Sequence, residues 1–183
     1  MAAMEERTIS TTRAYEGRIV SLRVDEVELA DGRRTSREVV EHPGAVAILA
    51  WDGARLALVR QWRHAAGEEL LEVPAGTLDH PHDATEQTAR RELAEECGLA
   101  ARSWEAGPTF YTAPGFCTER MEVFLATGLT PASDASTADD EEIVTEWLSL
   151  DEALRACDDG RIRDAKSLAA IGWLSRRMRA EPA

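Results

Sequence analysis

The chain has 183 residues, and its 34 acidic and 21 basic side chains give a formal net charge of −13. This length can bury the core of a single domain, and a composition of 44% hydrophobic and 30% charged residues excludes a disordered or collagen-like chain. The longest apolar run, Ala45–Trp51, has only seven residues, which excludes a membrane span, and residues 1–7 lack the apolar core of a signal peptide.

The first part of the chain predicts an N-terminal antiparallel β-ribbon. Residues 1–14 are polar and unpatterned, so we expect them to form a flexible N-terminus. From residue 15 the sequence becomes strand-like and reaches Asp31 and Gly32, a pair of residues typical of a tight hairpin turn. A second strand over residues 33–41 completes a ribbon that spans residues 15–42.

The remainder, residues 43–180, predicts one mixed α/β domain, because strands and helices are interspersed without a linker or repeat. Strands are expected at residues 45–50, 55–62, 69–73, 104–112, 119–126 and 143–148. Helices are expected at residues 84–97, 150–157 and 164–178. Gly98 is placed to end the first helix, and either Ser149 or Asp151 could cap the second.

Cysteine content and charge also limit the partners of this protein. The three cysteines show no Cys-x-x-Cys spacing, which argues against a disulfide framework and against a zinc site. A strongly acidic surface repels the phosphate backbone of nucleic acids, whereas an excess of carboxylates suits metal ions. We therefore expect a cytoplasmic protein with neither a membrane nor a nucleic acid as its partner.

Three glutamates of the first predicted helix, Glu92, Glu95 and Glu96, are spaced to lie on one helix face. Like charges at this spacing destabilise a helix by roughly a few tenths of a kcal/mol per pair, and a hard divalent cation would neutralise them. The alternative is a solvated acidic face, which we would prefer for an isolated Glu-x-x-Glu-Glu segment. Gly76 before the helix and Gly98 after it indicate a strand–loop–helix unit and favour the metal site.

The segment from Gly76 to Leu99 resembles a Nudix box, whose pattern is G-x5-E-x7-R-E-U-x-E-E-x-G-U, where U is aliphatic. Residues 91–99 match the second half of this pattern at every position. In the first half, Gly76 stands fifteen residues before Arg91 where the pattern has fourteen, and Asp83 replaces the mid-box glutamate. The resemblance implies a Nudix-type α/β/α sandwich with a mixed β-sheet, to which the N-terminal ribbon is added.

The segments that flank the box are similar to those of ADP-ribose pyrophosphatases. Residues 71–76 resemble the strand that enters the box in that group, and residues 118–120 are similar to it as well. Pro114, sixteen residues after Gly98, resembles the mark of ADP-ribose specificity. The resemblance covers residues 15–178 and implies hydrolysis of ADP-ribose to AMP and ribose 5-phosphate.

Other functions stay open at this point. Another nucleoside diphosphate sugar, for example GDP-mannose, is the main alternative substrate. A non-catalytic ADP-ribose-sensing Nudix domain is less favoured, because such domains usually lose box acids that this chain retains. RNA decapping is disfavoured by the negative charge and by the lack of a basic stripe.

The resemblance also implies the ligands of a metal ion, Mg²⁺ or alternatively Mn²⁺. Glu92 and Glu96 would hold the ion, with Glu95 beside them and the backbone carbonyl of Ala75 as a further ligand. The general base would be Glu141, with Glu142 as the fallback. Composition alone would favour a solvated acidic loop around these two glutamates.

Three further residues are implied to contact the substrate. Arg63 matches an arginine that contacts the pyrophosphate, and the planar guanidinium suits phosphate oxygens. Glu119 falls where the family contacts the terminal ribose. Arg37 matches an arginine near the adenosine end, although a plain strand-surface charge is an equal alternative. Similar enzymes are homodimers that exchange the N-terminal ribbon, so we expect a homodimer in which Arg37 reaches the site of the neighbouring copy.

Overall fold

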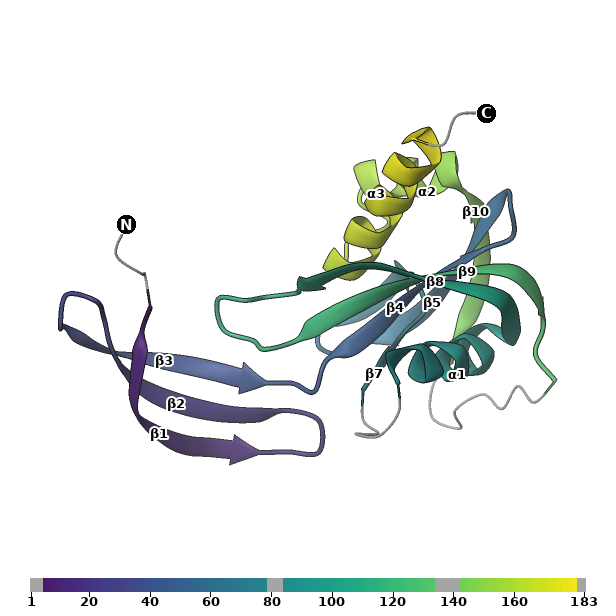
Figure 1. The fold of residues 1–183 in the computed structure, drawn as a ribbon. Coiled ribbons are helices and arrows are strands. Elements are labelled where there is room, and N and C mark those ends of the chain that lie inside the picture. Colours follow the sequence, from purple (N-terminus) through teal and green to yellow (C-terminus); the bar gives the residue numbers. More distant parts are fainter. Residues whose placement is uncertain (1–4, 79–83, 134–141, 181–183) are drawn as a thin grey trace. The chain divides into compact units, whose positions relative to one another are not determined.

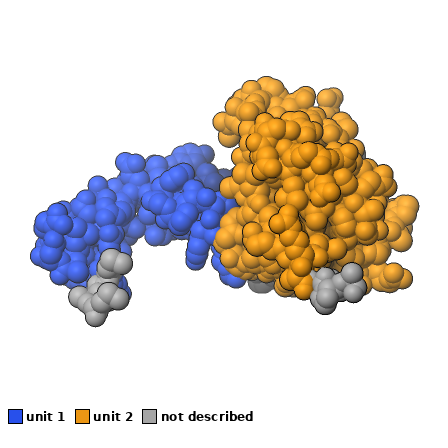
Figure 2. All heavy atoms as spheres, turned by 90° about the horizontal axis from the view of Figure 1, so that it is seen from above, with its two compact units in different colours: residues 1–44, 111–120 blue, residues 45–110, 121–183 orange. Residues whose placement is uncertain are grey.

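The computed structural model describes residues 5–78, 84–133 and 142–180, and the chain divides into two compact units (Figure 1). Unit 1 comprises residues 1–44 and 111–120, and unit 2 comprises residues 45–110 and 121–183 (Figure 2). Each unit is described by itself.

In the described part of unit 1, three strands form an antiparallel sheet in the order β1-β2-β3. Their bounds are Arg7–Glu16, Ser21–Glu28 and Arg34–Glu41. Gly32 in the turn between β2 and β3 has a φ of 81°, which explains why the Asp-Gly pair marks the hairpin there. The predicted ribbon is therefore present, with one additional strand.

The expectation of a flexible segment over residues 1–14 is wrong from Arg7 onward, because β1 occupies that stretch. The strand lacks an apolar face, so its sequence carries no hydrophobic alternation. Polar cross-strand contacts accompany its pairing with β2 instead: Arg7 donates to Glu28 at 2.9 Å, and Thr11 donates to the buried Asp25 at 2.8 Å.

The connection between the strands β8 (Leu99–Tyr111) and β9 (Arg120–Pro131) belongs to unit 1 as well, although the sequence suggested that it is part of the larger domain. The N–H of Val40 on β3 donates to the carbonyl of Phe116 at 2.7 Å, and the N–H of Thr118 donates back to the carbonyl of Val40 at 2.9 Å. These two backbone hydrogen bonds attach the connection to the edge of the ribbon.

Within the described residues, unit 2 is built on a mixed seven-stranded sheet. Its central strand β4 (Ala45–Trp51) pairs in parallel with β9 (Arg120–Pro131) and antiparallel with β5 (Arg55–Arg63) and β7 (Ala75–Thr77). The sheet order is β10-β5-β4-β9-β8, with β6 paired to β5. The bounds of the other strands are Glu68–Glu72 for β6, Leu99–Tyr111 for β8 and Val144–Ser149 for β10.

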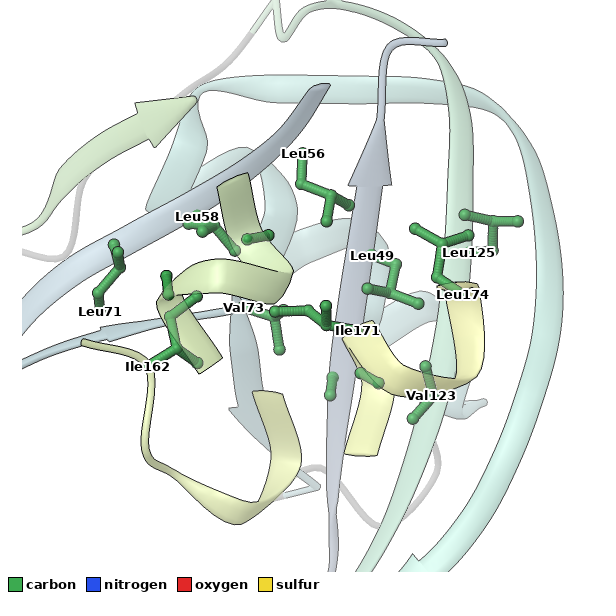
Figure 3. Packing of buried hydrophobic residues seen from close by; sticks show 14 of the residues in the cluster. Leu49, Leu56, Leu58, Leu71, Val73, Val123, Leu125, Ile162, Ile171 and Leu174 are labelled. Atoms are coloured by element: carbon green, nitrogen blue, oxygen red, sulfur yellow. The ribbon is translucent and has the colours of Figure 1, made fainter. Parts of the chain in front are cut away.

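Helices cover both faces of this sheet, so unit 2 has two hydrophobic clusters. Ala47 and Leu49 of β4 pack with α2 (Leu150–Asp158) and α3 (Ala165–Ala180) on one face (Figure 3). Val46 and Ile48 of the same strand pack with α1 (Thr85–Cys97) on the other. A strand buried on both faces is apolar at every position, as β4 is. The predicted α/β/α sandwich with a mixed sheet is confirmed.

The predicted helix ends are also confirmed. Gly98 has a left-handed φ of 64° and ends α1, donating its N–H to the carbonyl of Ala94 at 3.0 Å. Ser149 rather than Asp151 caps α2, because its hydroxyl accepts the N–H of Glu152. In the part of the chain that the structure describes, no helix is both long and apolar enough to cross a membrane.

Candidate active site

The strand β7 and the helix α1 bring the residues of the box together. β7 is fixed by its pairing with β4, where Gly76 lies opposite Val46, and the carbonyl of Pro74 accepts the N–H of Ile48 at 2.8 Å. α1 packs on the same face of the sheet through its buried residues Ala89 and Leu93. Both elements are thus held by the core, which sets the distance between their polar side chains.

The side chain of Glu92 lies directly against the backbone of Gly76. A Cβ atom at position 76 would overlap the carboxyl group of Glu92, so only glycine permits this close approach. The Glu92 side chain is 13% exposed, and its Oε1 lies 2.9 Å from Nη2 of Arg91. The glycine of the box therefore makes room for a carboxylate at the strand.

Glu96 lies one helical turn further on and is half-buried beside Ala75, whose N–H donates to Oε2 of Glu96 at 3.0 Å. Burial raises the pKa of Glu96 to about 8, and the negative charge of Glu92 acts in the same direction. The hydrogen bond from Ala75 and the positive charges of Arg63 and Lys166 oppose this rise. The ionised form of Glu96 is thus disfavoured unless a further cation is bound.

Glu95 lies nearer the surface of α1 than the other two box acids. Its side chain is 36% exposed, and its Oε2 lies 3.0 Å from Nη1 of Arg91. Arg91 therefore bridges Glu92 and Glu95, and Glu96 faces Ala75 instead.

A second group of charges lies where β5, β6 and the start of α3 meet. Glu72 at the end of β6 is 3% exposed, and its Oε2 accepts a hydrogen bond from Nε of Arg63 at 2.6 Å. Nζ of Lys166 donates to the other carboxylate oxygen at 2.5 Å and to Oδ1 of Asp164 at 2.9 Å. Arg63 and Lys166 are also the two cations that lower the pKa of Glu96, so the two groups of charges adjoin.

The other three predicted substrate contacts lie in unit 1. Arg37 on β3 donates from Nε to Glu6 at 3.0 Å, and its side chain is 41% exposed. Oε2 of Glu119 accepts the hydroxyl of Thr112 at 2.5 Å. Pro114 is exposed in a turn that is closed by a hydrogen bond from the N–H of Phe116 to Ala113.

The two candidates for the general base are placed differently. Glu142 is exposed, just before β10, whereas Glu141 lies outside the described residues, as does Asp83 of the box. The hydroxyl of Thr145, near the start of β10, lies 3.5 Å from the carbonyl oxygen of Glu96. The strand that follows Glu142 therefore begins beside the box helix.

Comparisons with known proteins agree with this geometry. Residues 41–171 match the NUDIX domain family, and residues 6–40 match the family described as the nucleoside diphosphate sugar hydrolase N-terminal domain. The chain belongs to the Nudix family. Together with the retained Glu92, Glu95 and Glu96, this membership makes it a Nudix pyrophosphohydrolase.

Two relatives and one solved structure illustrate the similarity. An ADP-ribose pyrophosphatase of Bacillus subtilis is 38% identical over 176 residues, which cover 95% of each chain. A methanol dehydrogenase activator of Bacillus methanolicus is 40% identical over 172 residues, which cover 93% of this chain and 92% of the relative. A crystal structure of an ADP compounds hydrolase has a TM-score of 0.86, covers 98% of this chain and 97% of its own, and at 19% identity shows the shared fold.

The donor chemistry of this Nudix site fits a divalent metal ion. Glu92 and Glu96 present two carboxylates, and burial, together with the smaller effect of the Glu92 charge, raises the pKa of Glu96, so that its ionised form calls for a cation. Among the described residues, no group of three or more acids, histidines or cysteines converges on a point that could hold a metal. The two half-buried carboxylates, with Glu95 outside them, are therefore the donors that the side chains offer.

Sequence reasoning missed Glu72 and Lys166. Glu72 is part of the segment 71–76 that suggested the subfamily, but a single acid in a strand carries no signal of its own. Lys166 did carry one, since it is the only lysine beside 20 arginines in the chain. A residue type that occurs once, two positions after Asp164 and in the first turn of α3, could have been singled out.

The pKa of Glu96 predicts a pH dependence of stability in metal-free protein. Because folding raises this pKa to about 8 from an ordinary 4.5, the folded state binds the proton more tightly than the unfolded state does. The contribution of Glu96 is therefore most favourable below pH 4.5 and declines as the pH rises to about 8. Chemical denaturation in EDTA should show a smaller loss of stability over this range for Glu96→Gln than for the wild type.

Glu152→Gln is the matched control for that measurement. Hydrogen bonds from Ser149 lower the pKa of Glu152 from its ordinary 4.5, so this group is ionised in both states over most of the same pH range. Its substitution should leave the slope of stability against pH unchanged. If Glu96→Gln showed the same slope of stability against pH as the wild type, the raised pKa of Glu96 would be contradicted.

Proposed function

We propose that this Nudix enzyme hydrolyses ADP-ribose to AMP and ribose 5-phosphate in a reaction that depends on Mg²⁺, with Mn²⁺ as the alternative ion. The half-buried pair of Glu92 and Glu96 beside Gly76 is the observation that carries the proposal, because such a pair calls for a divalent cation. The relative named ADP-ribose pyrophosphatase and the position of Pro114 support ADP-ribose as the substrate.

The proposed chemistry needs three contributions from the protein. Glu92 and Glu96 would hold the metal ion, which when bound would neutralise charge on the pyrophosphate and polarise the phosphorus. Arg63 donates hydrogen bonds to pyrophosphate oxygens, which orients the bond to be cleaved. Glu141 or Glu142 accepts a proton from the attacking water, so that AMP and ribose 5-phosphate leave as two phosphate monoesters.

GDP-mannose, or another nucleoside diphosphate sugar, is the second candidate substrate. Hydrolysis of the pyrophosphate would proceed through the same residues, and the match of residues 6–40 to a domain of nucleoside diphosphate sugar hydrolases fits either substrate. A non-catalytic sensor of ADP-ribose is disfavoured, because Glu92, Glu95 and Glu96 are all retained.

A homodimer with exchanged N-terminal ribbons is part of the proposal. Tyr15, Ile19 and Val20, around the turn between β1 and β2, are 59%, 41% and 38% exposed. Apolar side chains on an exposed ribbon favour a second copy of the chain as its partner. Arg37 would then serve the site of the neighbouring copy. A cytoplasmic location stays a prediction from composition.

A hydrolysis panel tests the substrate. With Mg²⁺, ADP-ribose should give AMP faster than GDP-mannose gives GMP, and EDTA should stop both reactions. Glu92→Gln should lose most activity while keeping the wild-type melting temperature, because the lost carboxylate serves the metal rather than the core. Glu86→Gln, on the exposed face of the same helix, is the control and should remain active. Wild-type protein that binds ADP-ribose without releasing AMP would revive the sensor hypothesis.

The general base is tested by two single substitutions. Glu141→Gln should lower kcat by about two orders of magnitude, the usual scale for loss of a general base, with little change in KM or in Mg²⁺ affinity. Glu142→Gln should keep most of the wild-type kcat. The opposite result would move the role to Glu142, and full activity in both variants would remove the base from this loop.

Assembly is tested by light scattering at micromolar concentration. The proposed dimer should show twice the chain mass of 20.1 kDa. Tyr15→Asp, which places a charge in the apolar part of the ribbon, should shift the mass toward that of the monomer. A wild-type monomer would contradict the exchange of ribbons.

A further inference from the structure

Lys166 is the only lysine of the chain, and most of its side chain is shielded from solvent. Its side chain is 11% exposed at the start of α3, whereas lysines are rarely buried in folded proteins unless they are paired. The other 20 basic residues are all arginines. The buried position of this single ammonium group therefore needs an explanation in terms of its partners.

Glu72 divides its two carboxylate oxygens between two different cations. Oε1 accepts Nζ of Lys166 at 2.5 Å, and Oε2 accepts Nε of Arg63 at 2.6 Å. With the Glu72 side chain 3% exposed, water does not compete strongly for either oxygen. Each cation thus has one oxygen of the same buried carboxylate.

This division determines how the guanidinium of Arg63 is held. A guanidinium beside an unshared carboxylate usually binds both oxygens through two parallel N–H groups. Because Lys166 occupies Oε1, Arg63 is bonded to Glu72 through Nε, and its terminal nitrogens have no hydrogen-bond partner among the described residues. The Arg63 side chain is 34% exposed, so these terminal N–H groups can reach a ligand.

The ammonium group of Lys166 is itself fixed by the start of α3. Oδ1 of Asp164 accepts Nζ of Lys166 at 2.9 Å and the N–H of Ser167 at 3.1 Å. The hydroxyl of Ser167 in turn accepts the N–H of Val73, next to Glu72, at 2.8 Å. The first turn of α3 and the end of β6 are therefore joined at adjacent residues.

We propose that Lys166 is a positioning residue for Arg63: by occupying one oxygen of Glu72, it keeps the terminal nitrogens of Arg63 available for the pyrophosphate of the substrate. This rests on the proposed function, in which Arg63 contacts that group. Without Lys166, Glu72 binds Arg63 through both oxygens and withdraws it from the substrate.

A double-mutant cycle tests this role in the full-length enzyme. Lys166→Met should raise KM for ADP-ribose roughly tenfold, the scale of one charge-assisted hydrogen bond, with kcat nearly unchanged. In an Arg63→Ala background the same substitution should change KM less than twofold, since the residue through which it acts is gone. A lysine that only stabilised the fold, or that touched the substrate itself, would raise KM by the same factor in both backgrounds.

Arg163→Met is the matched control. Arg163 pairs with Glu68 at the other end of β6, so this variant removes one positive charge from the same two segments without touching Glu72. Its KM should equal that of the wild type. Lys166→Gln, which keeps a neutral donor for Glu72, takes the place of Lys166→Met if the latter does not fold.

A measurement without turnover uses the fact that the chain has one lysine. Protein labelled with ¹³C at lysine Cε should give a single side-chain NMR signal, which should shift in Arg63→Ala and stay in place in Arg163→Met. A wild-type KM for Lys166→Met in an active enzyme, or a lysine signal indifferent to Arg63→Ala, would overturn the positioning role. Wild-type protein that releases no AMP from ADP-ribose would instead refute the proposed function, while the NMR comparison would still report on the contact.

Discussion

The close approach of two like-charged side chains, Glu92 and Glu96, to the backbone of β7 is the constraint on which the rest of unit 2 depends. Gly76 permits it sterically, and the N–H of Ala75 compensates part of the charge. Burial, with a smaller effect from the charge of Glu92, raises the pKa of Glu96, so the ionised form of this acid is unfavourable without a cation. Because the box does not stabilise itself, the two hydrophobic clusters must hold α1 and β7 in place, and the fully buried Ala89 and Leu93 give α1 that anchor.

The same constraint explains why the charged residues of the site come from elements on both faces of the sheet. α1 lies on one face, and its acids approach β7 from there. Balancing cations come partly from the strand end at Arg63 and partly from α3, which covers the opposite face and reaches the end of β6 through Lys166. A buried carboxylate such as Glu72 is tolerated when both of its oxygens are paired, and here each oxygen has a different partner.

Sequence reasoning succeeded where the signal is local. The hairpin at Gly32, the end of α1 at Gly98 and the cap at Ser149 each follow from the conformational or hydrogen-bonding property of one residue. The box acids follow from helical spacing. Reasoning from the sequence failed where the interacting residues are distant in the chain. The polar strand β1 is ordered by its pairing with β2, and Lys166 binds Glu72, which lies 94 positions before it. Neither pairing leaves a periodic trace in the sequence.

Charge explains why acids and cations gather around β6, β7 and the box helix. The two adjoining groups contain the acids Glu72, Glu92, Glu95, Glu96 and Asp164 and the cations Arg63, Arg91 and Lys166. Acids alone would repel a pyrophosphate, and cations alone would give a metal ion no ligands. A site that must accept both therefore keeps them in adjoining groups, in which Arg63 has one nitrogen committed to the protein and two nitrogens left for an anion.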